Sequence, residues 1–137
     1  MIPEGAPVYE AETNGLVVRV VVTYVPQQSD PPKRYVWAYM VELENTGPKT
    51  VQLLSRKWII TDAQGRIEKV EGPGVVGEQP VIEPGETYQY TSGCPLPTPS
   101  GAMVGTYRMS VDGGEDFFDA AIPAFSLDLP SARRTVN

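Results

Sequence analysis

The sequence contains no histidine and only one cysteine, Cys94. Histidine is the commonest ligand of transition metals in proteins and the usual general base near neutral pH. One subunit therefore lacks the ligands for a tight zinc or copper site, and we expect no cofactor, no catalytic residues and no enzymatic activity. A single cysteine cannot form an internal disulfide, which agrees with a reducing compartment, and we expect a cytoplasmic protein.

Basic residues and long apolar segments are also scarce. Lys and Arg number 11 against 17 Asp and Glu, for a net charge of -6. Binding to a nucleic-acid backbone depends on clustered positive charge, so a nucleic-acid partner is not expected. No apolar run approaches the roughly 20 residues of a membrane-spanning helix. Residues 1–7 carry neither the basic nor the apolar region of a secretory signal, and we expect no membrane partner.

The sequence does contain a regular alternation of apolar and polar residues with a period of two. In the segment 35–43, for example, Trp37, Tyr39, Val41 and Leu43 share one face, which we predict to be core. Short segments of this kind, separated by turns rich in proline and glycine, predict an all-β antiparallel sandwich. The expected strands are residues 16–24, 35–43, 51–62 with a bulge at 55–57, 66–70, 87–92, 103–111, 117–122 and 124–129.

The length of the chain suits one domain. We expect a flexible N-terminal segment at residues 1–13, a single sandwich domain at 14–130 and a C-terminal tail at 131–137. The proline-rich segment 93–101, which contains Cys94, is predicted to be an extended loop. Strand edges can pair between subunits, so the sequence leaves open a monomer or a homodimer.

Gly72, Gly74 and Gly77 fall in the pattern G-x-G-x-x-G, which in dinucleotide-binding proteins holds a pyrophosphate at a helix N-terminus. Here a proline follows within three residues and leaves no room for that helix, so we predict a loop between strands. Two interpretations are open. Either the loop amides bind a phosphate or pyrophosphate, with Arg56 and Lys57 supplying positive charge, or the glycines only permit tight turns.

Val75 and Val76 place two apolar, β-branched residues inside this glycine-rich segment. Loops mounted on a rigid sandwich are where such folds usually bind their partners. We therefore expect both valines to serve recognition. On this hypothesis, replacing both with serine changes the stability of the fold little.

Three motifs resemble the ApaG family, also called CorD: residues 52–62, residues 70–80, and residues 90–95 together with 98–101. They occur in the family's order, and the likeness extends from about residue 18 to residue 129. The resemblance implies an immunoglobulin-like or fibronectin type III-like sandwich with no established enzymatic activity. It also implies a genetic link to cobalt and magnesium resistance or efflux. Related domains in eukaryotic F-box proteins and in a polymerase delta-interacting protein resemble protein-binding modules.

Two functions from different classes follow. The first is a non-catalytic binding module for a protein partner, and the alternative is a small-anion binder that holds pyrophosphate or a nucleotide at the glycine-rich loop. Phosphoryl transfer would also need carboxylates that hold a metal beside the phosphate. The acidic residues of segment 112–119 are more typical of a solvated hairpin, and Cys94 is more typical of packing than of a reactive thiol.

Overall fold

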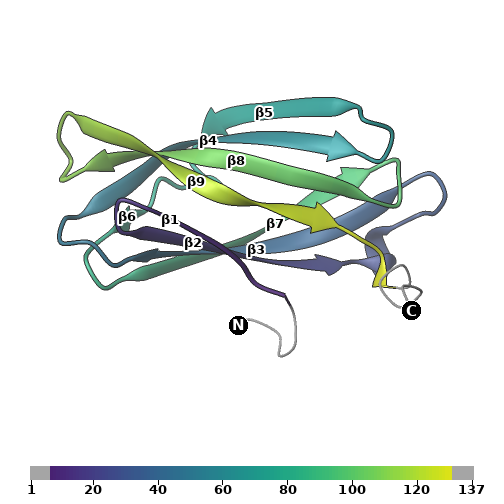
Figure 1. The fold of residues 1–137 in the computed structure, drawn as a ribbon, viewed down its shortest axis with the longest axis horizontal. Helices are drawn as coiled ribbons and strands as arrows, with labels where there is room; N and C mark the ends of the chain where they lie inside the picture. The colour runs from purple at the N-terminus through teal and green to yellow at the C-terminus, as the bar shows by residue number, and fades with distance from the viewer. Residues whose placement is uncertain (1–6, 131–137) are drawn as a thin grey trace.

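A computed structural model describes residues 7–130, which form two antiparallel β-sheets packed face to face (Figure 1). One sheet has the strand order β1–β2–β3–β7 and the other β5–β4–β8–β9, with the short β6 also pairing with β4. The predicted sandwich is confirmed. The strands are β1 (Tyr9–Thr13), β2 (Leu16–Tyr24), β3 (Tyr35–Asn45), β4 (Val51–Asp62), β5 (Ile67–Pro73), β6 (Val81–Ile82), β7 (Thr87–Leu96), β8 (Gly101–Val111) and β9 (Asp116–Leu127).

Helix is almost absent from the described part of the chain. The longest helical element wholly within residues 7–130 is η1 (Pro26–Gln28), a single 3-10 turn that begins with a proline. Nothing in this range forms a helix long and apolar enough to cross a membrane.

The core lies between the sheets because alternate residues of each strand point inward. Trp37, Tyr39, Val41 and Leu43 of β3 are all buried, as their period predicts. Aromatic rings join the two layers: the rings of Tyr39 and Trp58 lie with their centroids 5.4 Å apart and nearly edge to face. Aromatic side chains bury large apolar areas, so contacts of this kind contribute much of the stability of the sandwich.

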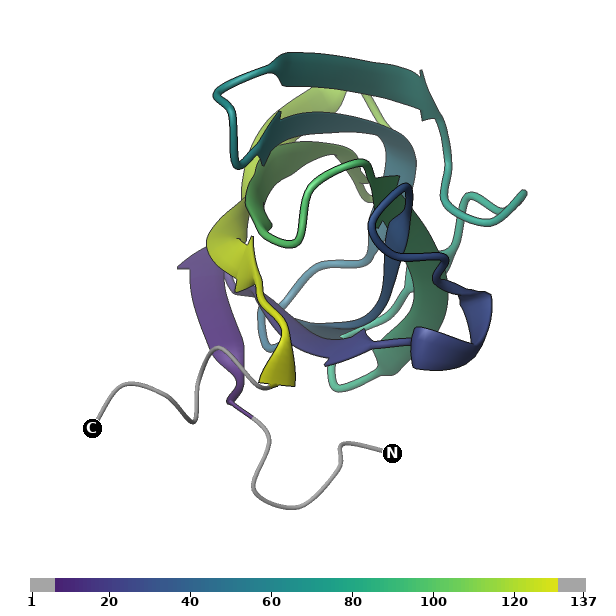
Figure 2. The ribbon, with the colours of Figure 1, turned by 90° about the vertical axis from the view of Figure 1, so that its right-hand side faces the viewer.

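The two long sides of the sandwich differ. On one side, called here the closed side, β1 lies beside β9. The Tyr9 and Phe125 ring centroids are 6.0 Å apart, and the Ala121 amide donates to Thr13 Oγ1 at 3.1 Å. On the other side, called the open side, β5 and β7 are the sheet edges. The end-on view in Figure 2 shows the segment between β5 and β6 projecting from the open side.

Residues 9–13 do not belong to a flexible segment, and this prediction is wrong. They form β1 and pair in register with β2, from Tyr9 opposite Val20 to Thr13 opposite Leu16. Their side chains alternate without being strongly apolar, because an edge strand buries only part of one face. Residues 1–6 of the predicted N-terminal segment and the predicted tail, residues 131–137, lie outside the described residues.

Two prolines stand inside strands, where the sequence predicted a loop or an interruption. Strand β7 continues through Pro95 and Leu96, so Cys94 lies opposite Trp37 in the sheet. Strand β9 continues through Pro123, at a bulge where the pairing with β8 shifts. Both strands are sheet edges, and an edge strand tolerates proline because its missing N–H can face outward or sit in a bulge.

Candidate functional site

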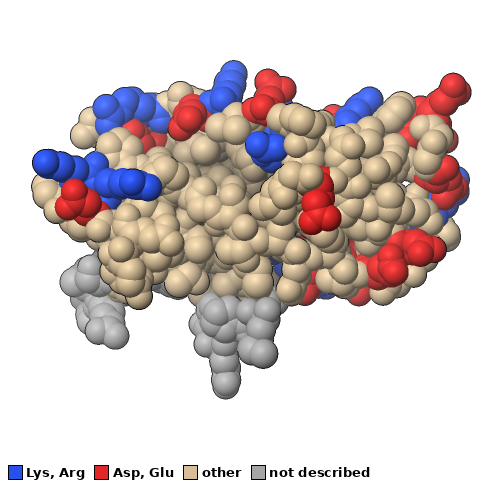
Figure 3. All heavy atoms as spheres, turned by 180° about the vertical axis from the view of Figure 1, so that it is seen from behind, with Lys and Arg blue, Asp and Glu red and all other residues tan. Residues whose placement is uncertain are grey.

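A pocket of about 350 Å³ opens between the two sheets on the open side. Figure 3 views the molecule from this side and shows a recessed surface, with both basic and acidic side chains along its upper half. We call it the Arg56 pocket. Strands β3, β4, β5 and β7 and the glycine-rich segment contribute its lining, which consists of Tyr39, Arg56, Trp58, Pro73, Val75, Val76, Gly77, Tyr90 and Ser92.

Arg56 is the single charged residue in this lining. It lies on β4 directly opposite Gly72 of β5, and its guanidinium group covers that glycine. A Cβ atom at residue 72 would lie only 3.1 to 3.3 Å from three guanidinium atoms. Nη1 of Arg56 donates to the carbonyl oxygens of Pro73 at 3.1 Å and Gly74 at 2.9 Å. Gly72 therefore makes room for a half-buried arginine.

Two tyrosines, Tyr39 and Tyr90, line the pocket from the four-stranded sheet, opposite the sheet that carries Arg56. Burial raises the pKa of Tyr39 and of Tyr90. A hydrogen bond with Ser92 partly offsets the rise for Tyr39, and one with Tyr107 partly offsets it for Tyr90. Burial also raises the pKa of Tyr107, whose hydroxyl is hydrogen-bonded to that of Tyr90. All three hydroxyls therefore stay protonated at neutral pH, and the positive charge of Arg56 is close enough to act on each of them.

A bulge in β4 places the glycine-rich segment beside the pocket. The pairing of β4 with β8 shifts between Leu53 and Ser55, next to the predicted position of 55–57. The carbonyl oxygen of Leu54, at the bulge, accepts hydrogen bonds from the Gly74 amide at 2.8 Å and from the Gln79 side chain at 2.9 Å. An irregularity in one strand thus fixes the loop of another, as bulges near binding sites often do.

The segment itself is a tight hairpin. The amides of Val75 and Glu78 each donate to the other residue's carbonyl oxygen at 2.8 Å. Val76 and Gly77 between them both have positive φ, as a type I′ turn requires. Gly74 also has positive φ, and a Cβ there would collide with the carbonyl of Glu78. The amides of Gly74, Val75 and Glu78 are therefore already engaged, which leaves few donors for the proposed cradle around a phosphate.

The two valines of the hairpin have different environments. Val75 is 0% exposed and belongs to the hydrophobic core, whereas Val76 is 55% exposed at the tip of the turn. The expectation that neither valine fills the core is wrong for Val75. Adjacent residues of one short turn point to opposite sides, and the sequence pattern alone could not tell which of them reaches the core.

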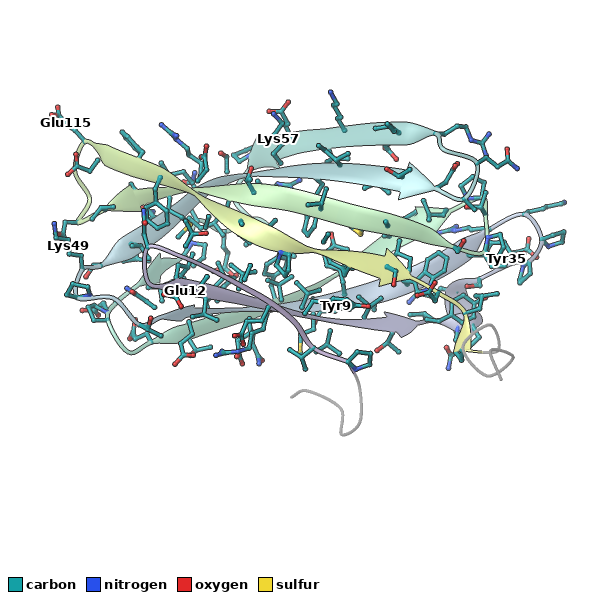
Figure 4. All side chains as sticks on the ribbon, viewed as in Figure 1. Tyr9, Glu12, Tyr35, Lys49, Lys57 and Glu115 are labelled. Atoms are coloured by element: carbon teal, nitrogen blue, oxygen red, sulfur yellow. The ribbon has the colours of Figure 1, made fainter. Side chains whose placement is uncertain are left out.

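Lys57 does not line the Arg56 pocket. Successive residues of a strand face opposite sides of the sheet, and Lys57 is exposed on the outer face of the five-stranded sheet (Figure 4). There it lines a wide groove of about 800 Å³ with Glu71, Thr106 and Arg108, and Arg56 also borders this groove. Arg56 therefore contributes to both surfaces, whereas Lys57 contributes only to the groove.

Other candidate groups are accounted for by structure. Cys94 is buried, and burial together with the nearby charge of Glu68 raises the pKa of its thiol to about 11, which agrees with a packing role. Within residues 7–130 no three Cys, Asp or Glu side chains gather as a metal site would require. Sequence reasoning assigned Tyr39 to the core. Its place beside an arginine, together with Tyr90, became visible only in the fold.

These features define an antiparallel sandwich of the immunoglobulin-like or fibronectin type III-like class, with a polar pocket on its open side. The match to the ApaG domain model over residues 26–111 then gives the family. Relatives called "Protein ApaG" are 58% identical in Mesorhizobium japonicum and 55% identical in Brucella anthropi, each alignment spanning 94% of this chain and 99% of the relative. The chain belongs to the ApaG family, as the resemblance of its motifs implies.

A solved structure supports the same conclusion. The crystal structure of a Bordetella pertussis protein called ApaA matches with a TM-score of 0.81 and 52% identity, over 84% of this chain and 94% of that chain. High sequence identity and near-complete coverage together mean that the arrangement of strands is shared along almost the whole domain.

Proposed function

We propose that this chain is a non-catalytic binding module that recognises a protein partner through the tip of the hairpin at residues 74–79. The observation that carries the proposal is the backbone conformation and the exposure of Val76. This residue combines a φ of 43° with a side chain that is 55% exposed. A β-branched residue is strained at positive φ, where glycine or asparagine is favoured. An apolar side chain kept exposed in a strained position is typical of a contact residue.

The hairpin is held in place before any partner arrives. Val75 anchors one side of it in the core, while Gly74 and Gln79 are hydrogen-bonded to the bulge at Leu54. The Gln52 side chain also donates to the carbonyl oxygen of Gln79 at 3.0 Å. A loop that is already ordered loses little conformational entropy on binding, which favours affinity.

We infer that the link to cobalt and magnesium resistance, implied by the family resemblance, operates through the partner and not through a metal held by this chain. The chain has no histidine. Among the described carboxylates, Glu10, Glu42 and Glu44 gather around the positive charge of Arg19, which takes the place a cation would occupy, and Asp62 is paired with Arg66. Elemental analysis of dialysed protein should find less than one tightly bound metal ion per chain.

The test replaces Val76 with asparagine. Val76→Asn removes the apolar contact and suits the positive φ, so thermal stability should stay equal or rise, while complementation of a cobalt or magnesium resistance defect should be lost. Val81→Asn is the matched control, because Val81 is 56% exposed but lies in the short β6. Full complementation by Val76→Asn would refute the proposed recognition surface.

A further inference from the structure

We propose that the Arg56 pocket binds a small oxyanion of the phosphate class, inorganic phosphate or pyrophosphate, through the Arg56 guanidinium and the hydroxyls of Tyr39 and Tyr90. The donors in this site are side chains of both sheets, whereas the sequence pattern suggested the amides of the glycine-rich segment. The proposal goes beyond protein recognition by Val76 and concerns a different ligand.

The positive charge of Arg56 has no carboxylate partner. Among the described arginines, Arg19, Arg66 and Arg108 each form an ion pair, and Arg34, Arg66 and Arg108 are exposed at the surface. Arg56 is more enclosed than these exposed arginines, yet no described carboxylate pairs with it, and its guanidinium donates to two neutral carbonyl oxygens. A partly buried charge without a counterion is unfavourable in a low-dielectric site, so an external anion would stabilise it.

Part of the guanidinium group is free to bind that anion. Nη1 makes both hydrogen bonds to the protein, those to Pro73 and Gly74. Arginine carries five N–H donors in a planar fork, and the hydrogens on Nε and Nη2 are directed to no described acceptor. The carbonyls of the hairpin therefore fix the orientation of the fork and leave its remaining edge for a ligand. Such an edge binds phosphate oxygens well.

Two hydroxyls complete the donor set. The Tyr90 hydroxyl is hydrogen-bonded to that of Tyr107, and either oxygen can be the donor. The Tyr39 hydroxyl is hydrogen-bonded to Ser92. A hydroxyl group rotates to suit its partners, so Tyr39 and Tyr90 can each direct a hydrogen at a ligand in the pocket that both residues line.

The chemistry of the lining favours phosphate over other ligands. No carboxylate lines the pocket, and the nearby Glu78 is hydrogen-bonded to the Tyr88 hydroxyl. Donors come from β3 and β7 of one sheet and from β4 of the other, so they surround a ligand from two sides. A tetrahedral oxyanion presents oxygens in several directions, whereas a planar carboxylate is satisfied by the arginine fork alone. The volume of about 350 Å³ accommodates either phosphate or pyrophosphate.

The experiment is calorimetric titration of the purified full chain with inorganic phosphate, pyrophosphate, a nucleoside diphosphate and acetate in separate runs. Pyrophosphate should bind, and Arg56→Gln should weaken it about tenfold or more, because charged hydrogen bonds are lost. Tyr39→Phe, which removes one oxygen atom, should weaken it about threefold to tenfold. Lys57→Gln is the matched control: it removes the neighbouring charge on the opposite face and should change the affinity less than about twofold.

Thermal unfolding shows whether each variant is folded. If Arg56→Gln is not folded, the affinity of Tyr39→Phe for pyrophosphate tests the proposal. Binding of the nucleoside diphosphate with the same dependence on Arg56 would identify a larger phosphorylated molecule as the source of the anion. The proposal is overturned if neither phosphate nor pyrophosphate binds at about 10 mM. It is also overturned if acetate binds as tightly as pyrophosphate, or if the Arg56 and Tyr39 variants bind like the wild type. Val76→Asn removes none of these donors, so the two proposals fail separately.

Discussion

The closed and open sides of this sandwich solve the same problem differently. Each sheet ends in an edge strand, and an edge leaves backbone groups and core residues open to water. On the closed side Tyr9 and Phe125 bring β1 and β9 together through an aromatic contact. On the open side β5 and β7 are separated by a pocket that contains Arg56 and Tyr90.

On the open side, polar groups take the place of the apolar contacts that join the edge strands on the closed side. Apolar contacts between edge strands stabilise the fold in proportion to the area they bury. A charged guanidinium group and protonated hydroxyls in the same place contribute less to stability, but they can bind a ligand. The open side is therefore expected to tolerate substitution of its polar groups. Substitutions on the closed side, and of the core residues between the two sheets, are expected to destabilise the fold.

The largest effect is expected at the closed side. Phe125 is almost fully buried and its ring contacts Tyr9, Tyr39 and Trp58. Phe125→Ala should lower the free energy of unfolding by about 3–5 kcal/mol, because it removes a large buried ring and leaves a cavity. Urea denaturation monitored by tryptophan fluorescence measures this. A loss below about 1 kcal/mol would show that β1 and β9 are not sealed by this cluster.

The next effect separates core from surface within the open side. Val75→Ser should cost about 1.5–3 kcal/mol because a fully buried side chain becomes smaller and polar. Val76→Ser should change stability by no more than about 0.5 kcal/mol, because its side chain is already exposed. Chemical denaturation of the two single variants gives both values. Equal losses for both would contradict the opposite environments of the two valines.

A smaller effect is expected at Gly72. Gly72→Ala places a methyl group 3.1 to 3.3 Å from the guanidinium of Arg56, so that group must move by a few tenths of an ångström, and its bonds to Pro73 and Gly74 should weaken. The free energy of unfolding should fall by about 1 kcal/mol, and any anion affinity at the Arg56 pocket should fall with it. Gly65→Ala is a comparison for a turn glycine with positive φ but no close neighbour. A Gly72→Ala variant that binds pyrophosphate like the wild type would separate the anion site from the orientation of Arg56.

The smallest effect is a dependence on pH at the turn that leads into β5. Burial opposes ionisation of Asp62, but hydrogen bonds from the Arg66 side chain and from the amides of Arg66 and Gln64 prevail and lower its pKa. Because the folded-state pKa is below the unfolded one, this stabilisation is complete above the unfolded pKa and is lost as the pH falls through the folded one. Stability curves of the wild type and Asp62→Asn should therefore converge in acid. A difference that stays constant down to pH 2 would exclude this origin.

Much of the fold follows from local pattern. The alternation in residues 16–24 and 35–43 places side chains on two faces whatever lies next to them, and the bulge in β4 lies close to the break in alternation. The extent of β7 and β9 does not follow in this way. Pro95 and Pro123 read locally as interruptions, and only their position in edge strands makes them compatible with a sheet.

The features of the candidate site can also be divided into those that follow from local sequence and those that depend on the tertiary structure. The sequence by itself determined an antiparallel sandwich, a glycine-rich hairpin without a helix, and the scarcity of metal ligands, because these depend on residue type and short-range period. Tertiary structure alone decided that Arg56 and not Lys57 faces the hairpin, that Val75 is core while Val76 is surface, and that tyrosines from a second sheet meet the arginine. The physical reason is that the bulge at Leu54 and the packing of one sheet on the other set these positions, and both involve strands far apart in the sequence.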